Sequence, residues 1–468
     1  MTANPSTPLM AGLRPYPDYK ESGLPAVGRM PAHWSQRRMK FLFRERVQKG
    51  FPDEPLLAAT QTKGVVRKAD YGERTVTVTK DFHLLKLVEP GDYVISLRSF
   101  EGGIEVAHCR GIISPAYTVL TPQPDAQGGY FTRFFKAPDF IRSLTLFVTG
   151  IREGQNIDYE RLSRAYMPLP PPEEQAAIVR FLDYANGRLE RAIRSKRKVI
   201  TLLHKQKQAI IHRAVTRGLD PTVHLKPSGI PWLGDIPEHW ERTRLKFEAS
   251  HIVDCLHATP SYRSDGFYPA IRTADIEPGR VRLERARKIS EAEFKRWTAR
   301  LKPEAGDILY SREGERFGIA ANVPPATELC ISQRMMVFRI RKRQNSEYLM
   351  WQLNCQHVYL QASLYVIGST APHVNVDQIK NFQLAVPPLH EQKTIIEYIS
   401  AECGVLSSAI ARLEREISLL REYRTRLVAD VVTGKLDVRE AAAKLPELPV
   451  EPLAPEPEES SEPEEVES

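Results

Sequence analysis

The sequence predicts an α+β protein with two tandem α/β domains, each followed by a long helix. The two helices are expected to pair as an antiparallel coiled coil, so that the two halves are related by pseudo-twofold symmetry. Three observations support this prediction: heptad-spaced apolar residues, a duplication that covers most of the chain, and short strand-like runs between the duplicated motifs. From Leu406 to Val431 apolar residues recur at alternating steps of four and three, which requires a partner helix.

The same apolar pattern occurs 217 residues earlier, as the pair Leu189 and Leu406 shows. Both copies carry a basic residue at the equivalent place, Lys207 and Arg424. Because the spacing and its polar interruption both repeat, we expect the two stretches to pack against each other. The predicted seam consists of Leu189, Ile193, Ile200, Leu203, Ile210, Leu406, Ile410, Leu413, Ile417, Leu420 and Leu427.

Three short motifs recur around the predicted helices. A proline- and glycine-rich segment ending in His-Trp occupies 22–34 and again 228–240, and we expect Trp34 and Trp240 to be packing residues. Each helix is preceded by a Pro-Pro motif with Glu-Gln, at 169–175 and 386–392. Each helix closes with Val-Thr and then Leu-Asp, at 215–220 and 432–437. A repeat this long is a tandem duplication and not a solenoid.

The repeats place the domain boundaries. We expect a flexible N-terminus (1–18), a first variable domain (19–168), a long helix (169–220), a second variable domain (221–386), a second long helix (387–440) and a disordered acidic tail (441–468). Runs rich in β-branched and aromatic residues predict strands at 74–79, 92–97, 116–120, 307–311 and 335–340. Helices are predicted at 137–148 and 347–362 within the two variable domains.

Charge is unevenly distributed along the chain. The formal net charge is +8, but the tail from Ala441 carries nine glutamates and one lysine, which leaves the rest of the chain at +16. A strongly basic body favours a polyanionic partner such as nucleic acid, although a soluble protein with a solvated basic surface has the same composition. No apolar run reaches the roughly 18–20 residues of a membrane span, and the N-terminus lacks a signal-peptide pattern. The five scattered cysteines form no CxxC pair and fit a reducing cytoplasm.

No catalytic spacing is present in the sequence. Gly434-Lys435 is followed by leucine and lies at a helix end, so it predicts no phosphate-binding loop. The string Asn322-Val323-Pro324-Pro325 lacks the order and the aromatic residue of an amino-methyltransferase site. The twelve histidines form no metal-binding pair. We therefore expect no catalytic residues and no metal ligands in this chain, and a nuclease site of scattered carboxylates remains as an alternative.

Basic and aromatic residues near predicted loops are the candidates for DNA contact. Arginine can bond guanine O6 and N7 as a fork, and arginine or lysine can neutralise phosphates. Arg312 directly follows a predicted strand in a glycine-containing loop, and Arg272 lies just after the apolar run 267–270. Either side chain could reach a groove, and we favour Arg312 as the one that reads a base. The DNA-binding candidates are Arg67, Lys68, Arg98, Arg110, Tyr262, Arg272, Ser311, Arg312, Arg316 and Arg334.

Taken together, the motifs resemble the specificity subunit of a type I restriction–modification system. The segment at 229–240, the Pro-Pro-x-x-Glu-Gln helix starts and the Val-Thr-Gly-Lys-Leu-Asp helix end at 432–437 carry the resemblance, which covers the chain up to about 440. The first copy departs from the pattern at 26–30 and at Arg217-Gly218, and the acidic tail lies outside it.

The resemblance implies a division of labour. The two variable domains would be target recognition domains, each reading half of a bipartite double-stranded DNA target, with the helices as spacer. Two methyltransferase subunits and ATP-dependent restriction subunits would supply the chemistry with S-adenosylmethionine, ATP and Mg²⁺, and no cofactor is expected in this chain. The alternatives are a coiled-coil adaptor that binds protein without DNA specificity, and the autonomous nuclease, which would cut DNA with magnesium alone.

Overall fold

The computed structural model describes residues 12–61, 63–71, 81–126, 129–149, 156–230, 232–314, 316–364 and 373–446. The chain divides into two compact units, of which unit 1 comprises residues 1–196 and 414–468, and unit 2 comprises 197–413. Two long helices, α6 (Pro172–Arg217) and α12 (Leu389–Val432), each contribute one part to unit 1 and the other part to unit 2.

Unit 1 contains one variable domain built on a four-stranded antiparallel sheet in the order β4-β11-β8-β9. Its other strand pairs are β1-β2, β3-β14, β5-β6, β7-β10 and β12-β13. The strands are β1 (Tyr19–Glu21), β2 (Arg29–Pro31), β3 (Ser35–Arg38), β4 (Phe43–Arg46), β5 (Leu57–Thr60), β6 (Gly64–Arg67), β7 (Lys86–Val88), β8 (Tyr93–Ile95), β9 (Glu105–Val106), β10 (Gly111–Ile113), β11 (Thr118–Pro122), β12 (Val148–Thr149), β13 (Asn156–Ile157) and β14 (Tyr166–Leu169). The helices are α1 (Met39–Leu42), α2 (Ser99–Gly102), α3 (Tyr130–Phe134), α4 (Pro138–Leu144), α5 (Tyr159–Ser163) and α13 (Arg439–Ala443).

Unit 2 repeats the central sheet in the order β18-β26-β23-β24 and adds a three-stranded sheet, β22-β19-β25, of its own. Its remaining pairs are β15-β16, β17-β27 and β20-β21. The strands are β15 (Leu225–Pro227), β16 (Asp235–Pro237), β17 (Glu241–Arg244), β18 (Ala249–Asp254), β19 (Tyr268–Ile271), β20 (Ile276–Glu277), β21 (Arg280–Val281), β22 (Arg287–Ile289), β23 (Ile308–Ser311), β24 (Ala320–Asn322), β25 (Cys330–Ile331), β26 (Met335–Ile340) and β27 (Gln383–Val386). The helices are α7 (Leu245–Glu248), α8 (Glu291–Trp297), α9 (Ser346–Leu353), α10 (Gln356–Ser363) and α11 (Val376–Lys380).

The duplication predicted from the motifs is therefore also a duplication of topology. The four-stranded sheets correspond strand for strand, and so do the pairs β1-β2 with β15-β16 and β3-β14 with β17-β27. Four of the predicted strands are present as β8, β11, β23 and β26, whereas the strand predicted at 74–79 lies outside the described residues. The two variable domains differ mainly in the smaller sheets that surround the shared one.

Three predicted segments differ from the structure. The helix predicted at 137–148 ends at Leu144 and gives way to a 3-10 turn and strand β12. The helix predicted at 347–362 is two helices, because the Asn354 amide bonds back to Met350 O and across to Ala320 O, which ends α9. Residues 12–18 were expected to be flexible, but Tyr16 is 3% exposed and its hydroxyl donates to Glu174.

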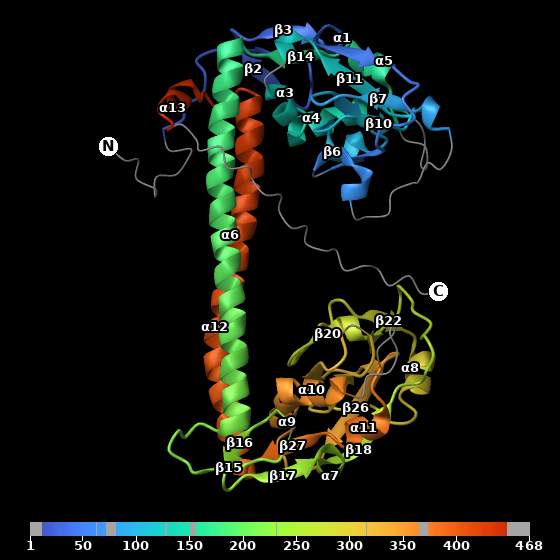
Figure 1. Ribbon diagram of the computed structural model, residues 1–468, viewed down its shortest axis with the longest axis vertical. Coiled ribbons are helices and arrows are strands. Elements are labelled where there is room, and N and C mark those ends of the chain that lie inside the picture. The colour runs from blue at the N-terminus through green and yellow to red at the C-terminus, as the bar shows by residue number, and fades with distance from the viewer. Residues whose placement is uncertain are drawn as a thin grey trace. The chain divides into compact units, whose positions relative to one another are not determined.

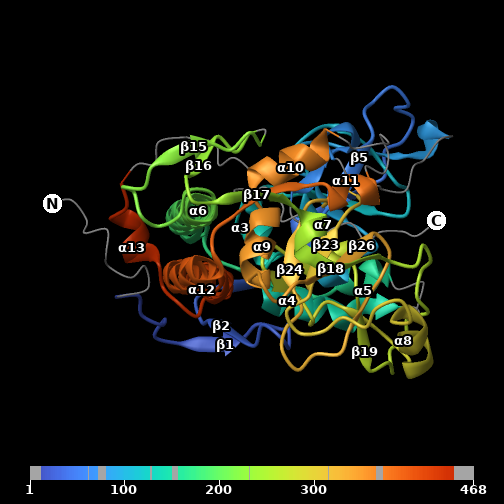
Figure 2. The ribbon, with the colours of Figure 1, turned by 90° about the horizontal axis from the view of Figure 1, so that it is seen from below.

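The long helices pair antiparallel in each unit, as predicted (Figure 1). In unit 1 Glu190 accepts a hydrogen bond from Arg424 Nη1 at 2.9 Å, and Lys196 Nζ contacts Glu416 at 2.5 Å. In unit 2 Lys207 Nζ lies 3.1 Å from Ser407 Oγ. Residue numbers rise along one helix as they fall along the other, and Figure 2 shows the two helices side by side, nearly end-on. The basic interruptions noted in the sequence, at 207 and 424, thus make polar contacts between the helices.

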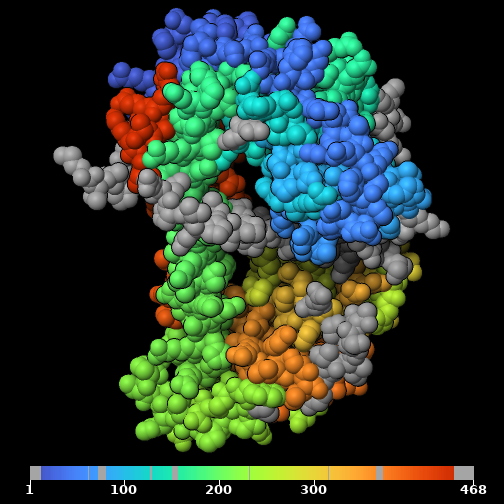
Figure 3. All heavy atoms as spheres, turned by 45° about the horizontal axis from the view of Figure 1, so that its top comes forward, coloured from blue at the N-terminus to red at the C-terminus, as the bar shows by residue number. Residues whose placement is uncertain are grey.

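The predicted seam residues face inward to different degrees. Leu189, Ile193, Ile410, Ile417 and Leu427 are buried. The other six, Ile200, Leu203, Ile210, Leu406, Leu413 and Leu420, are half-buried. Apolar residues off the seam remain exposed, among them Leu202 and Leu419, so the seam is the buried stripe of each helix. Helix α6, green in Figure 3, accordingly keeps one side open to solvent.

A carboxylate placed in this seam should disrupt it. Ile417→Asp is expected to lower the free energy of unfolding by about 3 kcal/mol or more, because a charge would replace a 7% exposed aliphatic side chain. Leu419→Asp on the same helix is the matched control, since Leu419 is 62% exposed. Thermal unfolding followed by circular dichroism measures both variants. Equal effects of the two substitutions would contradict the assigned seam.

Helix α12 is the one helix of the described residues that is long and apolar enough to cross a membrane by length and composition alone. The core helix of a soluble protein passes the same test, and the part of α12 in unit 2 buries Ile395, Ile399 and Cys403. This feature is therefore weak evidence for a membrane span.

A cluster of Trp, Tyr and Glu anchors the start of each long helix, and the two units contain equivalent clusters. In unit 1 the buried Trp34 donates its Nε1–H to Glu174 Oε1 at 2.9 Å, and His33 Nε2 lies 2.8 Å from Glu174 Oε2. In unit 2 Trp240 donates to Glu391 at 3.0 Å, and His239 lies 2.7 Å from it. The His-Trp motif thus binds the Glu of the helix-start motif. Both tryptophans are 0% exposed, which confirms their predicted packing role.

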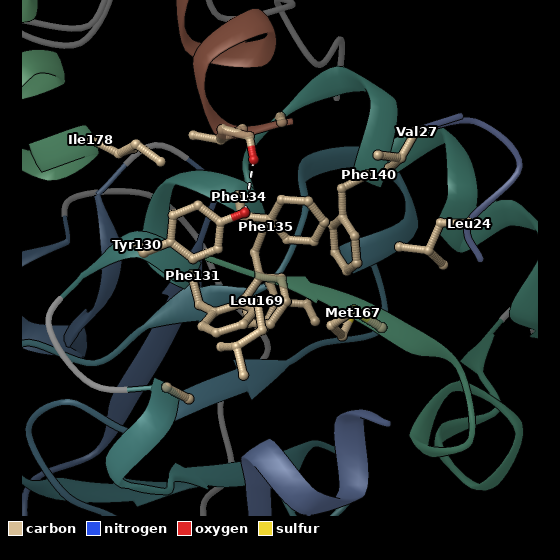
Figure 4. Packing of buried hydrophobic residues seen from close by; sticks show 14 of the residues in the cluster. Leu24, Val27, Tyr130, Phe131, Phe134, Phe135, Phe140, Met167, Leu169 and Ile178 are labelled. Carbon is tan, nitrogen blue, oxygen red and sulfur yellow. Dashed lines mark hydrogen bonds between the residues drawn. The ribbon is translucent and has the colours of Figure 1, made fainter. Parts of the chain in front are cut away.

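A tyrosine extends each cluster to the end of the other long helix. Tyr130 lies edge-on to Trp34 and donates to Val432 O at 2.7 Å, the bond dashed in Figure 4. Tyr348 lies edge-on to Trp240 and donates to Val215 O at 3.1 Å. Because the last carbonyls of a helix have no partner within the helix, these hydroxyls satisfy groups that burial would leave unpaired.

The helix-end glycines explain why these segments require that residue type. Gly218 has φ +73° and Gly434 has φ +77°, in the left-handed region that favours glycine. A Cβ at Gly434 would lie 2.9 Å from the Trp34 ring and closer still to Pro31, and one at Gly218 would lie 3.4 Å from Trp240. Each helix end therefore packs on the tryptophan of the unit in which that end lies.

One buried histidine in unit 2 predicts a pH-dependent stability. His357 is 1% exposed, and neither of its ring nitrogens has a hydrogen-bond partner. Burial, followed by the charge of His212, lowers the pKa of His357 to about 4. The unfolded chain binds this proton more readily, so stability is full above about pH 6.5 and falls as the pH drops toward 4. The expected loss is about 3 kcal/mol.

Hydrogen exchange of the α10 amides between pH 7 and pH 4.5 measures this dependence after correction for intrinsic exchange rates. His357→Leu should remove most of it, whereas His251→Leu, an exposed histidine of the same unit, should not. An unchanged pH dependence in the His357 variant would assign the effect to other groups.

Candidate nucleic-acid interface

The six DNA-binding candidates of unit 2 meet at one edge of the variable domain. Strands β19 and β25 are parallel, so their carboxyl ends lie together, at Arg272 and Ser332. Ser332 N donates to Ile271 O at 2.8 Å, and the Tyr262 hydroxyl lies 3.1 Å from Ser332 Oγ. Strand β23 ends beside them, because Arg312 N donates to Arg334 O at 3.0 Å. We call this edge the strand-end surface of unit 2, comprising Tyr262, Arg272, Ser311, Arg312, Arg316 and Arg334.

Arg312 does not have the position expected of a base-reading side chain. It is 6% exposed, its Nε lies 3.0 Å from Asp254, and its Nη2 lies 2.6 Å from Glu313. Its Nη1 also donates to Val374 O at 3.3 Å. The guanidinium is therefore occupied inside the domain, which argues against base contact by Arg312 in this conformation, and the contact itself stays a prediction. The role of Arg312 is to join strand β18 to the loop after β23.

Arg272 and Ser311 are likewise structural. Arg272 forms a bidentate ion pair with the fully buried Asp275, with Nε–Oδ2 at 3.0 Å and Nη2–Oδ1 at 2.9 Å. Asp275 also accepts from the backbone N–H of Arg272, which fixes the turn after β19. Ser311 is 0% exposed. Ser311 therefore lies beneath the surface, whereas the Arg272 side chain is 24% exposed and reaches the solvent in part.

The other three candidates reach the solvent in part. Tyr262, Arg316 and Arg334 are half-buried. Arg287 lies over the Tyr262 ring at 5.1 Å, and Arg316 Nη2 donates to Ile276 O at 2.8 Å. Arg334 stands out by its backbone, with φ +67°. These side chains remain candidates for DNA contact.

In unit 1 the candidates fall into two groups. Arg67, Lys68 and Arg110 lie around the start of β5, where Lys68 N donates to Leu56 O and Arg110 Nε donates to Glu54 at 2.7 Å. Arg98 lies apart, in the exposed loop after β8. That loop meets the β5–β6 turn, since Lys136 Nζ donates to both Gln61 O and Gly102 O.

The charges of these groups are not equally available. Arg110 is paired with Glu54 and Glu89, and these pairings raise its pKa, the hydrogen bond to Glu54 most of all. Arg67 and Arg98 are exposed. The loop after the corresponding strand thus exposes an arginine, Arg98, in unit 1 and encloses one, Arg312, in unit 2, which gives the two units different surfaces on corresponding sheets.

Two sets of residues were missed by the sequence analysis. Tyr130 and Tyr348, 218 residues apart, could have been found by extending the repeat into the variable domains. Phe267, immediately before β19, is 81% exposed, and no local pattern in the sequence indicates this exposure. No group of three or more His, Cys, Asp and Glu is arranged to hold a metal ion among the residues that the structure describes.

The two units thus place different side chains at the strand ends of matching four-stranded sheets. Residues 247–404 match the family described as "Type I restriction modification DNA specificity domain". The "Type I restriction enzyme MjaVIII specificity subunit" of Methanocaldococcus jannaschii is 24% identical over 307 residues, which cover 64% of this chain and 68% of that protein. The "Putative type I restriction enzyme MjaX specificity subunit" of the same organism is 22% identical over 319 residues, covering 66% and 68%.

A solved structure described as "Structural basis underlying complex assembly and conformational transition of the type I R-M system" shares the fold. It superimposes with a TM-score of 0.60 at 16% identity, covering 87% of this chain and 99% of that one. Residues 247–404 thus match a type I restriction–modification DNA specificity domain, and the similarity to curated specificity subunits supports DNA sequence recognition. The comparisons give no support to a protein-binding adaptor.

Proposed function

We propose that this chain recognises a bipartite double-stranded DNA target, with one half-site read by each unit, and directs methylation or restriction by partner subunits. The observation that most directly supports this proposal is the pair of matching four-stranded sheets, which have different residues at their strand ends. The shared scaffold would place two readers in equivalent settings, and the differing side chains would give each its own sequence.

The partners follow from this role. Two methyltransferase subunits would carry out base modification with S-adenosylmethionine, and restriction subunits would use ATP and Mg²⁺. The chain itself would contribute no catalytic group and would act in the cytoplasm, where chromosomal and incoming DNA are both accessible. Its basic body, with a net charge of +16 before the acidic tail, fits a DNA partner.

A domain exchange tests the two-reader proposal. Residues 41–167 are replaced by the matching domain of a related protein, and the methylated sites are sequenced in cells that also carry the methyltransferase subunit. One half-site should change, while the other half-site and the spacer length are retained. If both halves change together, or if neither changes, the two units do not read separately.

Salt dependence tests the electrostatic contribution. If the basic body contacts phosphates, the affinity of the complex for DNA should fall steeply between low and moderate salt. Deleting residues from 441 onward removes charge of the wrong sign for DNA and should leave specific recognition intact while raising nonspecific affinity. Binding that stays flat across this salt range would argue against phosphate contacts.

A further inference from the structure

Four described residues other than glycine adopt a positive φ: Asp81, Trp232, Ala326 and Arg334. Left-handed backbone is unfavourable for a residue with a Cβ, and glycine adopts it without this cost. Arg334 lies on the strand-end surface of unit 2, in the short link between β25 and β26. This position therefore carries an arginine where glycine would suit the backbone better.

Several hydrogen bonds hold the backbone around Arg334 in this conformation. Arg334 O accepts from Arg312 N at 3.0 Å, and the next carbonyl, of Met335, accepts from Cys255 N at 3.1 Å. On the other side Ser332 N is bound to Ile271 O. The link joins two sheets, because β25 pairs with β19 whereas β26 pairs with β18 and β23. Neighbouring structure therefore imposes the strain, as is usual where a strained residue has a function.

The side chain of Arg334 has defined surroundings. A Cβ at Gly314 would lie 3.8 Å from Arg334 Nη1, so the guanidinium lies beside the glycine loop that follows β23. Gly314 itself has φ +82° and keeps this side of the loop free of a side chain. The two neighbouring arginines, Arg272 and Arg312, are paired with Asp275 and with Asp254 and Glu313. The guanidinium groups of Arg272 and Arg312 are therefore engaged by carboxylates within the domain.

We infer that Arg334 is a specificity-determining residue of unit 2, whose guanidinium reads a guanine in the half-site of that unit. This rests on the proposed function. A phosphate contact needs only a mobile positive charge, whereas a bidentate contact to guanine O6 and N7 needs a fork held in one orientation. A strained and tightly held backbone supplies such fixation.

Substitution by glycine separates function from stability. Arg334→Gly should relieve the strained backbone, so the thermal midpoint of the full chain should not fall. At the same time, discrimination at one guanine-containing base pair should drop by roughly 5- to 150-fold. The measurement is binding of a randomised duplex library by the full chain with its methyltransferase subunit, followed by sequencing of the bound DNA.

Two further variants make the test specific. Arg334→Lys keeps the charge but loses the fork, so it should lose the same discrimination while keeping the salt dependence of binding. Ala326→Gly is the matched control, because Ala326 has φ +54°, is exposed, and lies in the β24–β25 loop. It should leave the sequence preference of the complex unchanged.

The outcomes are distinguishable. Wild-type discrimination in Arg334→Gly would overturn the inference. So would a uniform loss of affinity for all sequences with a shallower salt dependence, because that result identifies a phosphate contact. A fall in the thermal midpoint would also overturn it, since it would show that the side chain serves the fold. If the wild-type complex itself shows no sequence preference, it is the proposed function that fails.

Discussion

Arg312→Ala is expected to lower the free energy of unfolding of unit 2 by about 3–5 kcal/mol, because it leaves two enclosed carboxylates without their cation. The side chains of Asp254 and Glu313 are 16% and 22% exposed, so solvent compensates little for the lost guanidinium. Hydrogen exchange should show loss of protection in β18 and β23. Sequence preference should be affected only through this loss of structure.

An exposed arginine in the corresponding loop of unit 1, one position further along the aligned sequence, supplies the control. Arg98 follows the matching strand and is exposed, so Arg98→Ala should change stability by no more than about 0.5 kcal/mol. Adding Asp254→Asn to the Arg312 variant should recover part of its stability, because one unpaired charge is then removed. If Arg312→Ala folds with native stability and instead loses discrimination at a single base pair, Arg312 is a reader after all.

Trp240→Ala should have a comparable effect at the start of helix α12. The indole is 0% exposed, contacts Tyr348, and donates its N–H to Glu391, so truncation creates a cavity and leaves a carboxylate oxygen without its donor. The expected loss is about 3–5 kcal/mol. Amide exchange should increase in the first turns of α12 and around Val215.

A conservative variant divides this loss into its parts. Trp240→Phe retains most of the buried apolar surface but removes the hydrogen bond, and it should cost about 1–3 kcal/mol. Trp34→Ala should produce the same pattern in unit 1, around Glu174 and Val432. If Trp34→Ala and Trp240→Ala increase amide exchange in the same segments of the chain, the two clusters do not act on separate helix starts.

Local periodicity was sufficient to predict the two long helices and their seam, and the repeated motifs predicted the duplicated plan of the fold. Heptad spacing specified which faces of α6 and α12 are buried, and the repeated His-Trp and Glu-Gln motifs became contacts between residues about 140–150 positions apart. Such motifs are informative because the partners recur together in both copies.

The exposure of the strand-end residues could not be predicted in the same way. Arg312 and Arg98 look alike in sequence, each shortly after a strand, yet only Arg312 has an aspartate from a strand some sixty residues earlier beside it. Long-range packing decides which guanidinium is enclosed. The left-handed φ of Arg334 has the same origin, since it depends on hydrogen bonds from Arg312 and around Ile271 that no local pattern encodes.

The Trp, Tyr and Glu clusters have a consequence for how such a chain can evolve. They hold each variable domain to its helices through residues that lie away from the loops after β8 and β23. Most substitutions in those loops should therefore change what the protein binds without changing whether it folds, so selection acts on them through binding. Arg312 is an exception, because it lies in the loop after β23 and also stabilises the fold through its ion pairs with Asp254 and Glu313. Unit 1, where the arginine in the corresponding loop is exposed, should tolerate new preferences more readily than unit 2.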